Sequence, residues 1–173
     1  MSKSEIFNRI DINVWFMKFA LLAAERSTCC RMKTGAVIVK DGRIVCMGYN
    51  GVGSGQIHCQ DYWYNKYQEL KTNEEITSWE SFKLNENFLR QHHEWAIINE
   101  IHGEHNAILF ACKHGIVTDK TVMYSLYSPC TQCSKAIIQS GIKKIYYNKI
   151  YTNDVNGLNL LTQHKIEHEQ INI

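Results

Sequence analysis

Two pairs of reactive residues, at spacings that suit helix N-termini, constrain the fold of this chain of 173 residues. His102 is followed by Glu104, and Cys130 and Cys133 lie three residues apart directly after Pro129. Residues three apart share one face of a helix, and proline is favoured in the first turn. The positive end of a helix also lowers the pKa of a thiol, which suits metal binding. The spacings therefore predict two helix N-termini that face each other across one metal ion.

One histidine and two cysteines suit zinc, and three protein ligands leave a fourth position for water, whose pKa zinc lowers to about 7. We expect His102, Cys130 and Cys133 to be the ligands and Glu104 to move protons. This order of residues is typical of zinc-dependent nucleobase deaminases. Taken alone, the Cys-x-x-Cys could instead be a redox pair or half of a structural zinc site, and a lone His-x-Glu carries little information.

Net charge and hydropathy indicate which kinds of molecule this chain binds. The net charge is +2 and no stretch forms a basic tail, so a small substrate is favoured over a nucleic-acid polymer. No segment has the pattern of a membrane span or a signal peptide, so we expect no membrane partner and a cytoplasmic location. Seven cysteines in such a chain indicate metal ligands or buried thiols rather than disulfides, which prompts a search for a second metal site.

Apolar periodicity predicts an α/β fold in a single domain over residues 1–173. The predicted helices cover 11–25, 104–114, 130–140 and 158–164, and the predicted strands cover 35–40, 43–48, 121–127, 144–148 and 165–171. Asp41-Gly42 between the first two strands is a strong hairpin signal. A hairpin followed by alternating strands and helices implies one sheet with helices on both faces.

Two segments are less regular. Residues 56–92 are rich in aromatic and polar side chains and are predicted to be an insertion, with a helix over 73–90. The aromatic residues could stack on nucleobases, although a satellite core under a long loop is favoured. The glycine-rich loop 49–55 could bind a ligand or simply turn the chain, and it lacks the lysine-serine ending of a phosphate-binding loop.

Several further motifs carry a resemblance to a known family: Arg26-Ser-Thr-Cys29, Gly48-Tyr-Asn-Gly51, His58-Cys59, Glu104-His-Asn-Ala-Ile108 and Gln139-Ser-Gly-Ile-Lys-Lys144. With the His102–Cys133 signature, they make nearly the whole chain resemble the deoxycytidylate (dCMP) deaminase family. The insertion, with Cys29-Cys30 and Ile97-Ile98-Asn99-Glu100, is most similar to T-even phage members. The resemblance implies a cytidine-deaminase-like fold, which is a three-layer α/β/α sandwich with a five-stranded mixed sheet.

The resemblance also implies an activity, namely hydrolysis of dCMP to dUMP as a precursor for dTTP synthesis. Family members are often hexamers, activated by dCTP with Mg²⁺ and inhibited by dTTP. Within the fold, the alternatives are deaminases of dCTP, 5-modified dCMP, free cytidine or tRNA adenosine, of which the modest charge disfavours the last. A non-catalytic nucleotide sensor or a structural zinc module is a further alternative, which the intact Glu104 disfavours.

The same resemblance implies which individual residues bind the substrate and which bind the effectors. The substrate-binding residues would be Arg31, Asn50, Ser128, Tyr147 and Tyr151, and the effector-binding residues Gly48, Tyr49, Asn50, Gly51 and Lys113. Arg31 is expected to meet the 5′-phosphate, because arginine binds phosphate in a bidentate manner. The alternatives are a solvated surface charge for Arg31 and core or rim packing for Tyr147 and Tyr151.

Some relatives hold a second, structural zinc ion that ties the first helix to the insertion. Cys29 and Cys59 match two of its ligands, and His92, or less favourably His93, is expected to be the third. Ile97 stands where many cellular relatives have a cysteine, so Glu100 is the expected fourth ligand, since zinc accepts carboxylates. The alternative is that Cys29 and Cys59 are buried thiols.

Overall fold

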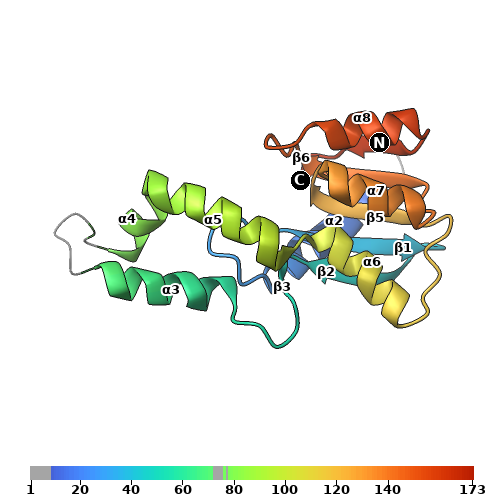
Figure 1. Ribbon diagram of the computed structural model, residues 1–173. Helices are drawn as coiled ribbons and strands as arrows, with labels where there is room; N and C mark the ends of the chain where they lie inside the picture. The colour runs from blue at the N-terminus through green and yellow to red at the C-terminus, as the bar shows by residue number, and fades with distance from the viewer. Residues whose placement is uncertain (1–8, 72–75, 77) are drawn as a thin grey trace.

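A single five-stranded sheet organises the molecule, of which the computed structural model describes residues 9–71, 76 and 78–173 (Figure 1). The strands lie in the order β2-β1-β5-β6-β7. Their bounds are Gly35–Lys40 for β1, Arg43–Tyr49 for β2, Val122–Tyr127 for β5, Lys144–Lys149 for β6 and Glu167–Gln170 for β7. β1 is antiparallel to both β2 and β5, whereas β6 runs parallel to β5 and to β7. The predicted five-stranded mixed sheet is therefore confirmed.

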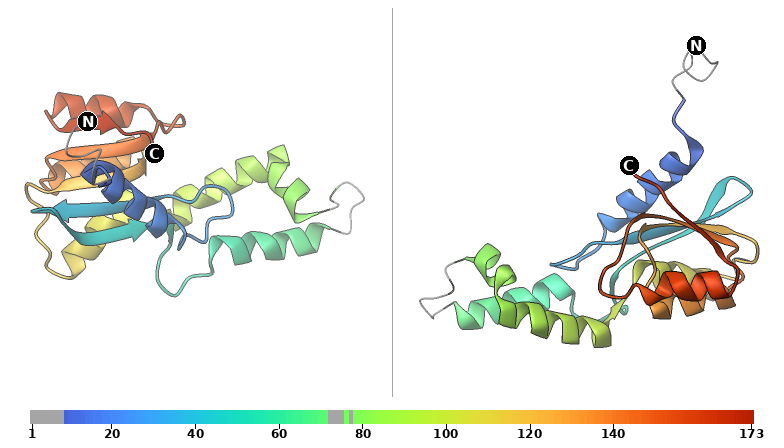
Figure 2. Two further views of the ribbon diagram at one scale, coloured as in Figure 1. Left: turned by 180° about the vertical axis from the view of Figure 1, so that it is seen from behind. Right: turned by 90° about the horizontal axis from the view of Figure 1, so that it is seen from above.

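Helices cover both faces of this sheet. α2 (Ile12–Ala24) packs on one face, and α6 (Gly103–Lys113), α7 (Thr131–Gln139) and α8 (Asn156–Gln163) pack on the other (Figure 2). Asp11 caps α2 as expected, since its side chain accepts hydrogen bonds from the backbone N–H groups of Asn13 and Val14. The predicted three-layer α/β/α arrangement is confirmed.

β1, an interior strand of the sheet, shows why these strands are continuous apolar runs in the sequence. Ala36 and Ile38 face α6, α7 and α8, whereas Val37 and Val39 face α2. Because successive side chains of a strand point to opposite faces, a strand covered on both sides is apolar at every position. The Asp41-Gly42 turn that follows has positive φ angles of 48° and 73°, as the hairpin signal predicts.

The insertion forms three helices that project beyond one end of the strands, and we call these helices the helical arm (Figure 1). They are α3 (Cys59–Leu70), α4 (Trp79–Leu84) and α5 (Glu86–Asn99). The helix predicted over 73–90 is wrong in outline: residues 72–75 and 77 lie outside the described residues, and the rest divides into α4 and α5 at Asn85. Asn85 has extended backbone angles and its side chain caps α5, so the helix cannot run through it.

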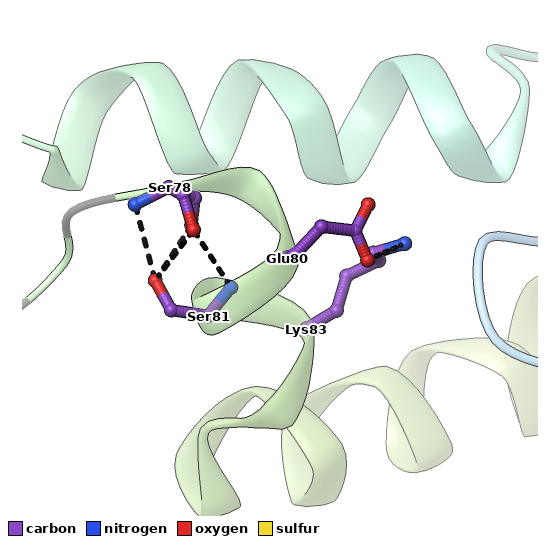
Figure 3. Close-up of polar contacts among 4 residues, drawn as sticks. All are labelled: Ser78, Glu80, Ser81 and Lys83. Atoms are coloured by element: carbon purple, nitrogen blue, oxygen red, sulfur yellow. Dashed lines mark hydrogen bonds and ion pairs between the residues drawn. The ribbon is translucent and has the colours of Figure 1, made fainter.

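Local caps fix the ends of the short helix α4. Ser78 and Ser81 form a reciprocal capping box, in which each side chain bonds the backbone N–H of the other (Figure 3). Lys83 pairs with Glu80 at 2.9 Å one turn away. A helix of six residues needs such contacts, because its intrinsic stability is marginal.

A satellite core holds the arm together. Its buried members are Cys29, Cys59, Trp63, Phe82 and Phe88. The ring of Trp63 packs edge-on against Phe88, with ring centroids 5.1 Å apart. The aromatic residues of the insertion therefore pack as a core, which was the favoured alternative from the sequence.

A two-stranded sheet at the base of the arm was not expected from the sequence. β3 (Gly51–Val52) pairs with β4 (Glu100–Ile101), so the end of the hairpin meets the end of α5. In the part of the chain that is described, no helix combines the length and the apolar character needed to cross a lipid bilayer.

Candidate active site and metal centres

The first cluster joins the N-termini of α6 and α7. His102 is the N-cap residue of α6, Cys130 is that of α7, and Cys133 lies in the first turn of α7. The Nδ1 atom of His102 lies 3.4 Å from Cys130 Sγ and 3.6 Å from Cys133 Sγ. Their potential ligand atoms all lie within 4.8 Å of one another. The structure thus brings together the three residues that the spacings predicted to share a metal ion.

The electrostatic environment gives one of these side chains, Cys130, the charge that a metal ligand needs. A hydrogen bond from the Cys133 thiol is the main cause that lowers the pKa of Cys130 to about 4. A hydrogen bond with Cys130 raises the pKa of His102 to about 9, against the opposing effect of burial. Cys130 is therefore a thiolate at neutral pH, the form that binds metals, and metal binding would release the remaining protons of the cluster.

Glu104 lies beside the cluster. Its side chain is only 4% exposed, and its Oε1 atom accepts a hydrogen bond of 3.0 Å from the hydroxyl of Ser125 in β5. Its Oε2 atom lies 3.7 Å from Cys133 Sγ. Burial is the largest cause that raises the pKa of this carboxyl group above its usual range. A carboxyl group whose pKa is shifted towards neutrality can both accept and donate a proton.

A carboxylate from the loop after β6 fixes the start of α7. Asp154 accepts hydrogen bonds from the backbone N–H of Thr131 at 2.7 Å and from its hydroxyl at 2.9 Å. The bond from the Thr131 N–H is the main cause that lowers the pKa of Asp154. In the sequence, the only signal for Asp154 is its place shortly before the helix predicted over 158–164, and that signal does not point to Thr131.

A cavity of about 550 Å³ opens beside the cluster. Of the expected substrate-binding residues, Arg31, Asn50, Ser128 and Tyr151 line it, together with His102 and Glu104. Arg31 is exposed, whereas the hydroxyl of Ser128 accepts a hydrogen bond from the Tyr151 N–H at 2.8 Å. Tyr147 is 7% exposed and is not among the residues that line the cavity, so its place corresponds to the core-packing alternative.

The expected effector-binding residues other than Asn50 lie outside this cavity. Gly48 is buried so closely under α6 that a Cβ atom would overlap the backbone of Gly103 and Ala107. Tyr49 lies with Gly48 in a separate groove of about 430 Å³ along β2, Gly51 pairs with Ile101, and Lys113 is exposed at the end of α6. Gly48 therefore has a packing reason to be glycine.

A second cluster lies where the helical arm meets the sheet. Its members are Cys29, Cys59, His92 and Glu100, whose potential ligand atoms all lie within 4.8 Å of one another. His92 Nε2 lies 3.3 Å from Cys59 Sγ and 3.7 Å from Cys29 Sγ. The four expected residues are thus brought together, whereas His93 is exposed and outside the group.

Two further details bear on what this cluster binds. The Oε1 atom of Glu100 is buried without a hydrogen-bond partner among the described residues, which fits a cation. Cys30, which is not among the ligands expected from the sequence, has its Sγ atom 3.7 Å from that of Cys59. The adjacent pair Cys29-Cys30 was the available signal.

Comparisons with known proteins agree with these features. A family model described as the cytidine and deoxycytidylate deaminase zinc-binding region matches residues 11–149. The deoxycytidylate deaminase of Enterobacteria phage T4 is 40% identical over 153 residues, which cover 82% of this chain and 79% of that protein. ComE operon protein 2 of Bacillus subtilis (strain 168) is 36% identical over 165 residues, which cover 95% of this chain and 74% of that protein.

A solved structure is also similar over nearly the full length. The dCMP deaminase from the cyanophage S-TIM5, crystallised in complex with dCMP and dUMP, matches with a TM-score of 0.67 and 30% sequence identity. The match covers 99% of this chain and 100% of that chain. The fold, the zinc-type cluster and the family match converge, and this chain belongs to the cytidine and deoxycytidylate deaminase family of zinc-binding enzymes.

Proposed function

We propose that this chain hydrolyses dCMP to dUMP and ammonia. The observation that carries the proposal is the buried Glu104, held by Ser125 beside the His102–Cys130–Cys133 cluster at a cavity. The names of the T4 and S-TIM5 relatives support dCMP as the substrate.

In this proposal His102, Cys130 and Cys133 would hold a zinc ion, which would supply the Lewis acidity that lets water react at neutral pH. Glu104 takes a proton from the attacking water on Oε2, while Ser125 holds Oε1. It delivers that proton to the ring nitrogen next to the carbon attacked, and then helps the exocyclic amine to leave as ammonia. The atoms balance as dCMP plus water giving dUMP plus ammonia.

Residues at the rim of the cavity would position the nucleotide. Arg31 is exposed and lines the cavity, so its guanidinium can meet the 5′-phosphate in a bidentate manner. Tyr151 lies edge-on to His102, with ring centroids 6.3 Å apart, and would wall the base. Ser128 contributes indirectly, because its hydroxyl holds the backbone of Tyr151.

The second cluster would hold a further zinc ion on Cys29, Cys59, His92 and Glu100. Sulfur, nitrogen and carboxylate oxygen are all accepted zinc ligands, and four protein ligands are typical of structural sites. The Oε1 atom of Glu100 is buried without a partner among residues 9–71, 76 and 78–173, which favours this proposal over two buried thiols, since such an oxygen is costly.

The biological setting is part of the same proposal. The dUMP product would feed dTTP synthesis, with dCTP and Mg²⁺ as activators, dTTP as inhibitor and a homo-oligomer, favoured as a hexamer. A cytoplasmic location would keep the thiols of both clusters reduced. Binding of an effector by Gly48, Tyr49, Asn50, Gly51 or Lys113 stays a prediction.

The test is loss of cytosine absorbance with dCMP, deoxycytidine and dCTP in parallel, with and without added dCTP and Mg²⁺. Of the three compounds, we expect fast turnover of dCMP only. The Glu104→Ala variant should keep its zinc, but its turnover of dCMP should fall by about 100-fold or more. Turnover of dCTP or deoxycytidine instead of dCMP would support another cytosine compound as the substrate. Zinc-loaded protein that releases no ammonia would support the nucleotide-sensor alternative.

A further inference from the structure

Both clusters open into the same cavity. Its lining includes Cys29, His92 and Glu100 from the second cluster, as well as His102, Glu104 and Cys130 from the site beside α6 and α7. A metal ion at the second cluster would therefore border the space that the nucleotide occupies, even though it lies outside the proposed chemistry. Proximity alone does not couple the two, so a contact that responds to the metal is needed.

Asn50 provides that contact. Its Nδ2 atom lies 3.4 Å from Glu100 Oε2 and also donates to the backbone oxygen of Met32 at 2.9 Å. Its Oδ1 atom accepts from the backbone N–H of Thr34 at 2.8 Å, and its own N–H donates to the Thr34 oxygen at 3.0 Å. With 4% exposure, Asn50 is a buried link between Glu100 and residues 32–34.

Residues 32–34 directly follow Arg31, and both Met32 and Thr34 line the cavity. An interaction that holds the side-chain amide of Asn50 in place would therefore also hold residues 32–34 in place. These residues form the part of the cavity wall next to Arg31. On the other side, Glu100 offers Oε2 to Asn50 and keeps Oε1 buried without a partner among the described residues. A cation in the cluster would stabilise a carboxylate group placed in this way, because it would pair with the buried oxygen.

We infer that metal occupancy of the second cluster sets the affinity for the nucleotide, through Glu100, Asn50 and residues 32–34. The inference rests on the proposed function and on the proposed second zinc, to which it adds a role beyond structural support. Glu100 and Asn50 act in it as positioning residues, since they transmit the effect of the metal to the wall of the cavity.

The experiment measures dCMP affinity by calorimetry in a Glu104→Gln background, which prevents turnover. Cys59→Ser removes a ligand that is fully buried and does not line the cavity. We expect this variant to hold one metal per chain instead of two, by elemental analysis, and its Kd for dCMP to rise by about fivefold or more. Cys112→Ser is the matched control, because Cys112 is exposed and belongs to neither cluster; it should keep both metals and the parent Kd.

A double-mutant cycle then tests the route. If the metal acts through Asn50, Cys59→Ser should cost no further affinity in an Asn50→Ala background. Equal losses in both backgrounds would show that the metal acts by another route, and a one-metal Cys59→Ser protein with the parent Kd would refute the coupling itself. A general structural role for Cys59 would give additive losses together with a lower thermal midpoint.

If Cys59→Ser does not fold, graded chelation of the Glu104→Gln protein can replace it. The Kd for dCMP is then compared before and after the second metal is removed. Trp63 stacks on His92 with ring centroids 5.8 Å apart, so tryptophan fluorescence can follow the second cluster. An unchanged Kd after the second metal is lost would overturn the inference. A two-metal parent protein that binds no dCMP would instead refute the proposed function, which is a distinguishable result.

Discussion

At the scale of single residues, the reactivity of Glu104 depends on one neighbour. Ser125 is completely buried in β5 and donates its hydroxyl proton to Glu104 Oε1 at 3.0 Å. Ser125→Ala would leave that buried oxygen without its donor and free the carboxyl group to turn. We expect kcat for dCMP to fall by about tenfold with the zinc content unchanged, as measured by cytosine absorbance and elemental analysis.

Ser134 supplies the control for this prediction. It is equally buried, but its hydroxyl oxygen has no hydrogen-bond partner within the described part of the chain. Ser134→Ala removes the same atom without removing a bond, so its kcat should stay near that of the parent. If both variants lost activity alike, the effect of Ser125 would be one of packing and not of the carboxyl group.

The reactive residues themselves were predictable from the sequence, because each pair is local. His102 and Glu104 are two residues apart, Cys130 and Cys133 three, and both pairs stand at starts of helices. Their partners were not predictable: Ser125 lies 21 residues from Glu104. Only the order of strands in the sheet brings Ser125 of β5 within reach of Glu104 in the first turn of α6, and no local pattern encodes that order.

At the scale of elements, α7 is held in place by a side chain outside it. Asp154 bonds both the N–H and the hydroxyl of Thr131. Asp154→Ala should lower the free energy of unfolding by about 1 kcal/mol, as loss of a helix cap does, and speed zinc release, because Cys130 and Cys133 lie at that end of α7. Urea unfolding and transfer of zinc to a chelator measure both effects.

The conservative variant Asp154→Asn tests whether the hydrogen bonds to Thr131 cause these effects. Asp154→Asn keeps an oxygen that can accept one of the two bonds from Thr131, so it should fall between the parent and Asp154→Ala in both measurements. Zinc release from Asp154→Ala at the parent rate would contradict a role in holding the metal-binding end of α7.

A second prediction at this scale concerns the packing of α6 on β2. Gly48→Ala would push a methyl group into the backbone of Gly103 and Ala107, and should cost about 1–3 kcal/mol of stability. Gly51→Ala, in the same four-residue motif, meets nothing within 4 Å and should be close to neutral. Urea unfolding of the two variants checks this, and equal stabilities would mean that α6 shifts without cost.

The elements that the sequence did not reveal share a physical reason. β3 and β4 have two residues each, too few for an alternating pattern to appear. In the arm, α3 has mostly polar and aromatic residues, since it buries only Cys59 and Trp63. By contrast, the strands of the sheet were predicted well, because β1 is apolar at nearly every position.

At the scale of the whole molecule, the arm and the sheet should differ in their response to loss of metal. Cys59 from α3 and His92 from α5 meet Cys29 and Glu100 outside the arm. Chelation should therefore speed amide hydrogen exchange in α3 and α5 well before β1 and β5, which lie in the centre of the sheet. Exchange measured by mass spectrometry checks this, and parallel loss of protection in arm and sheet would contradict it.

The short segment from Glu100 to His102 has a consequence for how the chain can change in length. Glu100 belongs to one cluster and His102 to the other, with Ile101 alone between them and paired to Gly51. Because extended side chains alternate in direction, one inserted or deleted residue here would turn one ligand away from its partners. Insertions are therefore expected to be tolerated elsewhere in the chain and not between Glu100 and His102. A residue added after Leu70, at the end of α3, would leave the spacing between these two ligands unchanged.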